Sequence, residues 1–210
     1  PPFIKIKRGP IKNKTSINYL NGNIDGYISY YESGQLKTKG NYKNGSPIGE
    51  WVEYYETEHI KSKKQFHEKH GLQPVETIEY YETGKVSSEE NRNISNGFNI
   101  GTLVQYDENG LLLSKTTYLE HNLMHEILYY NNGNKRIEHT KDIERNRAEG
   151  ERIEYYENGK IKKIQHFKSG KPSGVLIEYD EQDNVLSKEA LKTNSKRIIK
   201  ELKKELQILE

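Results

Sequence analysis

The sequence predicts an all-β fold, namely an elongated single antiparallel sheet or solenoid of about seven stacked β-hairpin repeats with a C-terminal amphipathic α-helix. Three observations favour it. A Tyr-Tyr-like pair recurs along the chain, a β-branched residue stands two positions before each pair, and turn dipeptides follow at short intervals. The apolar residues between the turns recur with a period of two, which is typical of strands and not of helices.

The first tyrosine of each pair sets the register of the repeat. The intervals between these tyrosines are 24, 26, 26, 23, 26 and 24 residues. The β-branched residues before them favour a pleated surface. The seven tyrosines are Tyr30, Tyr54, Tyr80, Tyr106, Tyr129, Tyr155 and Tyr179, and the β-branched residues are Ile28, Val52, Ile78, Val104, Ile127, Ile153 and Ile177.

Two tight turns are predicted in each repeat. Five repeats have a glycine four residues after the first tyrosine, as in ENGK at 157–160, where a hairpin turn needs a positive φ angle. A second turn follows further along, as at Asn44-Gly45 and Ser169-Gly170. Each repeat therefore reads as strand, turn, strand, turn.

The pattern changes near the C-terminus. We expect a β-hairpin repeat domain over residues 1–187 and a capping helix over 188–210, because apolar residues in the last segment recur at helical spacing. The helix is expected to close the open end of the sheet or to cover one face, since an uncapped edge favours aggregation. A helix-mediated dimer contact and binding to a membrane surface are the alternatives.

The composition excludes several classes of protein. Lys and Arg total 33 against 31 Asp and Glu, with the signs interspersed, so no basic surface for nucleic acid is expected. Cysteine is absent, which excludes disulfides and thiolate metal sites. No apolar run is long enough to span a membrane. The compartment is not predicted, although a signal peptide removed before Pro1 would place the chain in the periplasm or cell envelope.

The second aromatic residue of the repeat is the candidate binding feature. If the first tyrosine faces one side of the sheet, alternation places the second on the other side, next to two further aromatic residues. Such a row has two interpretations: stacking within the ladder together with the terminal helix covers it, or it is an exposed surface that binds a protein partner. Asp107 and Asp180 interrupt the row, so the fold alone does not require it. The candidate residues are Tyr27, Tyr31, Trp51, Tyr55, Tyr81, Tyr130 and Tyr156.

No residue pattern indicates a reaction. There is no cysteine nucleophile and no serine in a G-x-S-x-G elbow, and the glycine-rich segments precede strands, whereas a phosphate site needs a helix N-terminus. The local histidine pairs, such as His121 with His125, lie in predicted turns without a third ligand. We therefore expect a non-enzymatic chain that uses no cofactor and no metal.

Two stretches carry a resemblance to a known family: GEWVEYYE at 49–56 and GERIEYYENG at 150–159. From about residue 17 to 186 the repeat resembles the MORN-repeat family, and more closely its bacterial variant. The resemblance implies a curved sheet of stacked hairpins used for protein–protein contacts, with membrane association in some eukaryotic members. Many bacterial variants carry the label of toxin–antitoxin antitoxin component.

The function expected from the resemblance is a protein-binding scaffold, with a cognate toxin as the specific partner and the cytoplasm as its compartment. The alternative is a repeat protein associated with the cell envelope or a membrane surface. MORN repeats also precede the catalytic domain of some phosphatidylinositol phosphate kinases, but no nucleotide-binding loop or catalytic acidic motif is present here.

Overall fold

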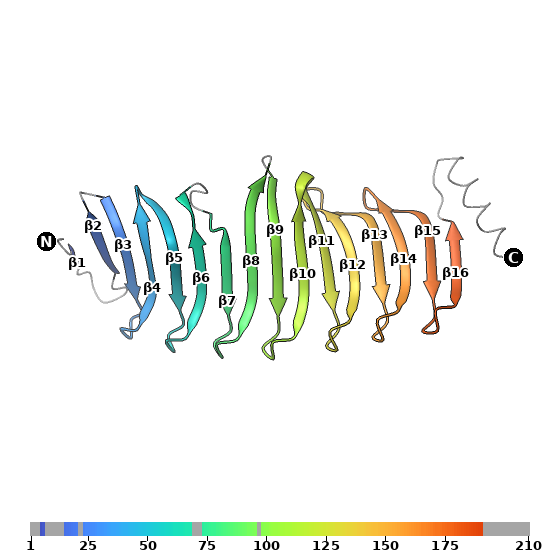
Figure 1. Cartoon of the computed structure of the whole chain (residues 1–210), viewed down its shortest axis with the longest axis horizontal. Coiled ribbons are helices and arrows are strands. Elements are labelled where there is room, and N and C mark those ends of the chain that lie inside the picture. Colours follow the sequence, from blue (N-terminus) through green and yellow to red (C-terminus); the bar gives the residue numbers. More distant parts are fainter. Residues whose placement is uncertain (1–4, 7–14, 21–22, 69–72, 96–97, 191–210) are drawn as a thin grey trace. The chain divides into compact units, whose positions relative to one another are not determined.

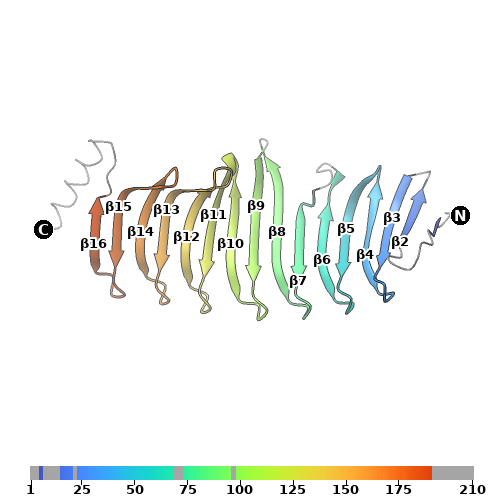
Figure 2. The same ribbon diagram turned by 180° about the vertical axis from the view of Figure 1, so that it is seen from behind.

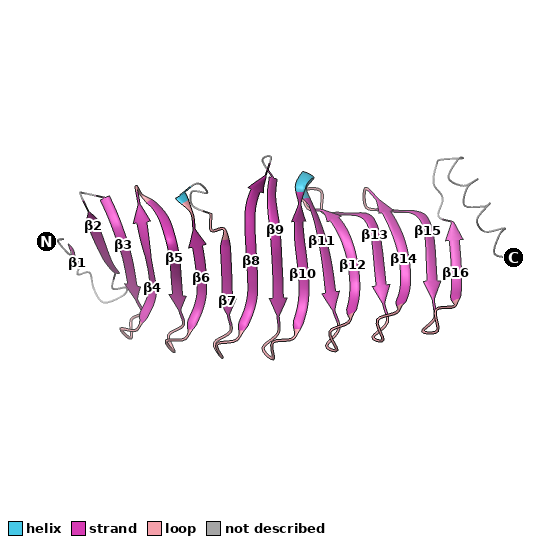
Figure 3. Cartoon of the chain, in the orientation of Figure 1, coloured by secondary structure: helices cyan, strands magenta, loops and turns pink. Residues whose placement is uncertain are grey.

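Strands and turns account for nearly all of the residues that the structure describes, which are 5–6, 15–20, 23–68, 73–95 and 98–190 of a computed structural model. Figure 3 shows this by colour; the short helical segments drawn there are 3-10 turns, such as Glu120–Asn122, and no α-helix occurs in these ranges. The order of the strands in the antiparallel sheet is their order in the sequence. This confirms the predicted all-β fold built from hairpins.

The chain divides into two compact units. Unit 1 comprises Pro1–Asn93 and Gly101–Leu111, and unit 2 comprises Ile94–Ile100 and Leu112–Glu210. The strands up to β7 belong to unit 1, those from β10 belong to unit 2, and β8 and β9 contribute residues to both. The strands are β1 (Lys5–Ile6), β2 (Thr15–Leu20), β3 (Asn23–Tyr30), β4 (Leu36–Lys43), β5 (Ser46–Tyr54), β6 (Ile60–Phe66), β7 (Glu76–Tyr80), β8 (Val86–Ser95), β9 (Phe98–Tyr106), β10 (Leu112–Leu119), β11 (Leu123–Tyr129), β12 (Lys135–Asp142), β13 (Arg147–Tyr155), β14 (Ile161–Lys168), β15 (Lys171–Tyr179) and β16 (Val185–Ala190).

The strand limits follow the predicted register. Each strand that carries a first tyrosine ends at that tyrosine, and the next strand begins six residues later, as β5 ends at Tyr54 and β6 begins at Ile60. In unit 1 the turns β3–β4, β5–β6 and β7–β8 lie at the same edge of the sheet (Figures 1 and 2). The same holds in unit 2 for β11–β12, β13–β14 and β15–β16.

The tight turns have the expected backbone. Gly84 has φ +85°, and the two repeats without this glycine place Glu58 and Asp183 at φ +68° and +69° instead. At the opposite edge Asn44 and Gly45 have φ +51° and +81°, the two positive angles of a type I′ hairpin turn. The turn residues therefore fix the hairpin register, as the sequence predicted.

Cross-strand pairing defines two faces in unit 1. One face, which we call the aliphatic face, carries the paired row Ile28, Lys39, Val52, Lys63, Ile78 and Glu89. The other, the aromatic face, carries the paired row Ser29, Thr38, Glu53, Ser62, Glu79 and Ser88.

Neither face builds a thick core. Val52 is only 3% exposed, and the other buried side chains in the described part of the chain are Pro47 and small hydroxyls such as Ser62. The hydroxyls lie between longer side chains of neighbouring strands, and the Ser88 hydroxyl donates to Glu79 Oε2 at 3.2 Å. Stability therefore comes from contacts repeated between adjacent strands.

The predicted helix begins too early. Residues 188–190 belong to strand β16, where Lys188 pairs with Ile177 and Glu189 with Leu176. The ladder to β15 outweighs the helical pattern of the sequence at this point, because it supplies backbone hydrogen bonds and side-chain contacts together. The remainder of the predicted helix, residues 191–210, lies outside the described residues.

Candidate binding surface

The second tyrosine of each pair opens the turn after the strand. In the β5–β6 turn the Tyr55 amide donates to the carbonyl of His59 at 2.8 Å, and the Tyr55 carbonyl accepts from the Glu58 amide at 3.0 Å. The same bonds occur at Tyr31, Tyr81, Tyr130 and Tyr156. The residue therefore lies beyond the last strand position, where simple alternation between the faces no longer applies.

The hydroxyl of this tyrosine bonds to the backbone of the following repeat. Tyr55 donates to the carbonyl of Tyr80 at 2.7 Å, so the ring crosses the intervening strand β6. Each of these tyrosines is partly buried and makes the same bond. The other four hydrogen bonds, from hydroxyl to carbonyl, are Tyr31 to Tyr54 at 2.6 Å, Tyr81 to Tyr106 at 2.7 Å, Tyr130 to Tyr155 at 2.8 Å and Tyr156 to Tyr179 at 2.7 Å.

Lysines lie over three of these rings. The ammonium nitrogen of Lys37 is 5.5 Å from the centre of the Tyr31 ring, and Lys61 and Lys162 lie similarly over Tyr55 and Tyr156. Each lysine follows its tyrosine by six residues, and cation–π attraction stabilises the pair. The aromatic row is thus covered in part by the chain's own side chains.

Aspartate replaces the second tyrosine at the end of each series of repeats. The carboxylate of Asp107 accepts from the amides of Asn109 and Leu111 at 2.8 Å each, and Asp180 accepts from two amides of its own turn at 2.9 Å. These bonds lower the pKa of Asp107. An aspartate therefore closes its turn locally and does not reach the next repeat, which explains the two interruptions seen in the sequence.

A four-ring cluster lies on the aromatic face of unit 1. Tyr27 stacks on Trp51 with ring centres 5.7 Å apart, and the rings of Tyr42 and Phe66 are steeply inclined to the indole, with centre distances of 5.0 and 6.2 Å. We call these four residues the Trp51 cluster. All four side chains are partly exposed.

Gly40 shapes this cluster. A Cβ atom added to Gly40 would overlap the indole of Trp51, so the ring lies directly over the backbone of β4. The indole nitrogen donates to the carbonyl of Asn41 at 3.0 Å, which fixes the orientation of the ring. The Trp51 ring is thereby held flat on the sheet and remains partly exposed. Glycine 40 is the signal in the sequence that could have located this site.

The predicted aromatic surface thus consists of two kinds of residue. Tyr27 and Trp51 come together in the Trp51 cluster, which also recruits Tyr42 and Phe66, two residues that sequence analysis did not select. The five second tyrosines instead connect successive repeats through their hydroxyls. Their use in partner binding stays a prediction.

A polar network surrounds Glu138 in unit 2. Its carboxylate accepts from Lys135 at 2.7 Å and from the Tyr155 hydroxyl at 3.0 Å, and His125 Nε2 lies 3.0 Å away. Burial alone would raise the pKa of Glu138, but the bonds from Lys135 and Tyr155 hold it below its usual value. Burial, together with the bond to Glu138, raises the pKa of Tyr155 to about 12. The network therefore neutralises a carboxylate with donors from within the chain.

Neither a membrane-spanning helix nor a metal-binding group is found in the described part of the chain. No described helix has the length and apolar character needed to cross a membrane. No group of three or more His, Asp or Glu side chains in the same residues could hold a metal ion.

The fold and the recurring side-chain bonds define a repeat protein of stacked β-hairpins. Within it, residues 27–44, 47–68, 75–93 and 148–169 match the family model described as MORN repeat variant. These stretches include strands of both units and support a repeat-based binding scaffold.

Comparisons with curated proteins and with solved structures do not identify a function. No curated protein matches the chain. One similar solved chain belongs to the Tc holotoxin pore of Photorhabdus luminescens, with 13% identity and a TM-score of 0.22. The match covers 87% of this chain and 12% of that one, and a TM-score this low does not indicate a shared fold.

Proposed function

We propose that the chain is a non-catalytic scaffold that binds a protein partner, and that the Trp51 cluster is the centre of the contact. The observation that carries the proposal is a group of four partly exposed rings, one of them held flat by Gly40, on a sheet face. Aromatic side chains give large contact areas at low cost in conformational entropy and dominate the energetics of protein interfaces.

The surroundings of the cluster support a protein contact. Lys64 pairs with Trp51 across β5 and β6, and Glu53 follows two residues after Trp51 on the same face. A central aromatic group with charged neighbours has the anatomy of a small interface, in which an apolar centre is surrounded by a polar rim. The finer proposal, that the partner is a cognate toxin, rests on the resemblance described above.

The test is an affinity measurement with a purified partner. Proteins captured from the source cells by the immobilised chain are identified, produced in pure form and titrated calorimetrically. Trp51→Ala is expected to weaken binding at least tenfold, as truncation of a central aromatic residue usually does. Because this change also removes packing, Lys64→Glu serves as a second variant that alters only the rim.

The control variant is Lys171→Ala, which removes the same charge from an exposed position of unit 2. Its affinity should equal that of the unmodified chain. Equal affinities for Trp51→Ala, Lys64→Glu and the control would refute the assignment of this face. The toxin proposal is tested separately by co-expression, in which the chain should restore growth to cells that carry its captured partner.

A further inference from the structure

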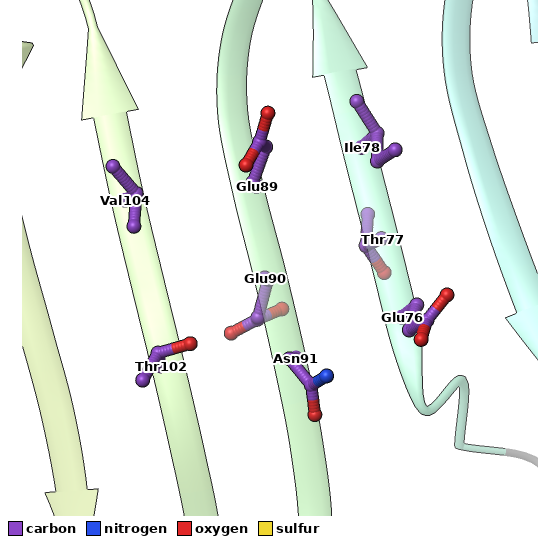
Figure 4. Close-up of a pocket in the computed structure, with 8 residues that line it drawn as sticks. All are labelled: Glu76, Thr77, Ile78, Glu89, Glu90, Asn91, Thr102 and Val104. Atoms are coloured by element: carbon purple, nitrogen blue, oxygen red, sulfur yellow. The ribbon is translucent and has the colours of Figure 1, made fainter.

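A pocket of about 200 Å³ lies on the aliphatic face of unit 1 between β7, β8 and β9. Figure 4 shows the side chain of Glu89 between Ile78 and Val104, and that of Glu76 at the end of the pocket where Asn91 and Thr102 lie. The pocket is smaller than those that enclose drug-sized molecules, so its size suits a single side chain. Its lining combines aliphatic side chains with three carboxylates, those of Glu76, Glu89 and Glu90.

Two of these carboxylates, Glu76 and Glu89, have no cation from the described part of the chain. Neither Glu76 nor Glu89 forms an ion pair there, whereas the neighbouring Glu90 is paired with Arg92. On the aliphatic face, the residues at the position of Glu89 in the two preceding repeats are Lys39 and Lys63. The sign of the charge therefore reverses at this pocket.

The Glu138 network in unit 2 shows what this position binds when a cation is available. Glu138 and Glu89 are at equivalent positions of their repeats, because Glu138 pairs with Ile127 and Glu89 pairs with Ile78. Likewise His125 pairs with Thr140 where Glu76 pairs with Asn91. In unit 2 the carboxylate is bound by the ammonium of Lys135 at 2.7 Å.

Two sequence differences leave the corresponding carboxylate of unit 1, Glu89, without an internal cation. The residue six positions after the first tyrosine is Lys135 in unit 2 and Val86 in unit 1, so the internal ammonium is missing. The position of His125 holds Glu76, which adds a second negative charge. The same pleated framework therefore presents two carboxylates where its counterpart presents a neutralised one.

We propose that the Glu76–Glu89 pocket receives a lysine or arginine side chain of a protein partner. The methylene groups of such a side chain pack against Ile78 and Val104, and its cation binds the two carboxylates. This inference rests on the proposed scaffold function and adds a second contact, of defined charge, on the face opposite the Trp51 cluster.

The first test uses the full chain and two small peptides as probes. Acetyl-Gly-Lys-Gly-amide is titrated at low ionic strength while the backbone amides of Asn91, Thr102 and Val104 are followed by NMR. The matched peptide with norleucine in place of lysine keeps the methylene groups without the charge. The lysine peptide should shift these amides in a saturable and salt-sensitive way, and equal shifts with norleucine would overturn the proposal.

Variants of the pocket sharpen the result. Glu76→Gln and Glu89→Gln should each weaken binding about two- to fivefold, the range expected for one exposed ion pair. Val86→Lys should abolish binding while preserving the fold, because Lys135 occupies that position in unit 2. Glu32→Gln, which changes the same charge in an exposed turn of unit 1, is the control. Binding that survives Val86→Lys unchanged would refute the inference.

The two proposals fail in different ways. If a partner binds and Trp51→Ala weakens it but Val86→Lys does not, the scaffold function stands and the pocket inference is wrong. If the lysine peptide binds the pocket but no protein partner is captured, the charge preference stands and the scaffold function fails.

Discussion

The hydroxyl bond between successive repeats gives the sharpest test of how the sheet is stabilised. Tyr55→Phe removes the donor to the Tyr80 carbonyl, a 2.7 Å bond in a partly buried site, and leaves the ring in place. A hydrogen bond of this kind contributes about 1 kcal/mol net, with a range of roughly 0.5–1.5. We expect the free energy of unfolding of unit 1 to fall by about that amount.

The adjacent Tyr54 provides a matched control. Its hydroxyl has no hydrogen-bond partner in the described part of the chain, so Tyr54→Phe should change stability by less than about 0.5 kcal/mol. Urea unfolding followed by the fluorescence of Trp51, the single tryptophan of the chain, reports on unit 1. Equal losses for Tyr54→Phe and Tyr55→Phe would refute the proposed role of the inter-repeat bond.

Three further outcomes are expected. Gly40→Ala should destabilise unit 1 by roughly 1–3 kcal/mol and shift the emission of Trp51, because the new methyl group displaces the indole; unchanged emission would contradict the close contact. Burial lowers the pKa of His139, so the stability contributed by the neutral imidazole is present above pH about 6.5 and is lost as the pH falls below that value. In thermal melts, the melting temperature of His139→Gln should therefore fall less steeply with acidification than that of the unmodified chain. The raised pKa of Tyr155 stabilises the fold below pH about 10, and this contribution is lost as the pH rises toward 12, so the stability gap to Tyr155→Phe should close over that interval; a constant gap would argue against the bond to Glu138.

The sequence predicted the repeat framework closely because that framework depends on local signals. The strands end at the first tyrosines, and the turns take positive φ angles at residues such as Gly84. Period-two alternation and turn chemistry act within a few residues, so a single sequence contains them. The start of the terminal helix was misplaced because Lys188 and Glu189 respond to a partner strand, which helical spacing cannot reveal.

The site was harder to predict than the strands. The phenol of Tyr55 bonds to a carbonyl 25 residues further on, which requires the register of three strands to be known. Grouping Trp51 with Tyr42 and Phe66 likewise depends on cross-strand distances. Sequence alternation selected residues of the right type, and only the pairing of the strands separated those that join repeats from those that form a cluster.

The phenol bonds all run the same way along the chain, from one repeat to the repeat after it, and this gives the array a direction. Removing repeats from the C-terminal side would leave the hydroxyl of the last second tyrosine without its acceptor. This does not happen if the chain ends after the turn of Asp107 or Asp180, because these carboxylates accept hydrogen bonds from their own turns. The two aspartates therefore mark positions where a series of repeats can end. A chain lengthened by duplication could gain whole hairpins before either aspartate, and every tyrosine hydroxyl would still have an acceptor.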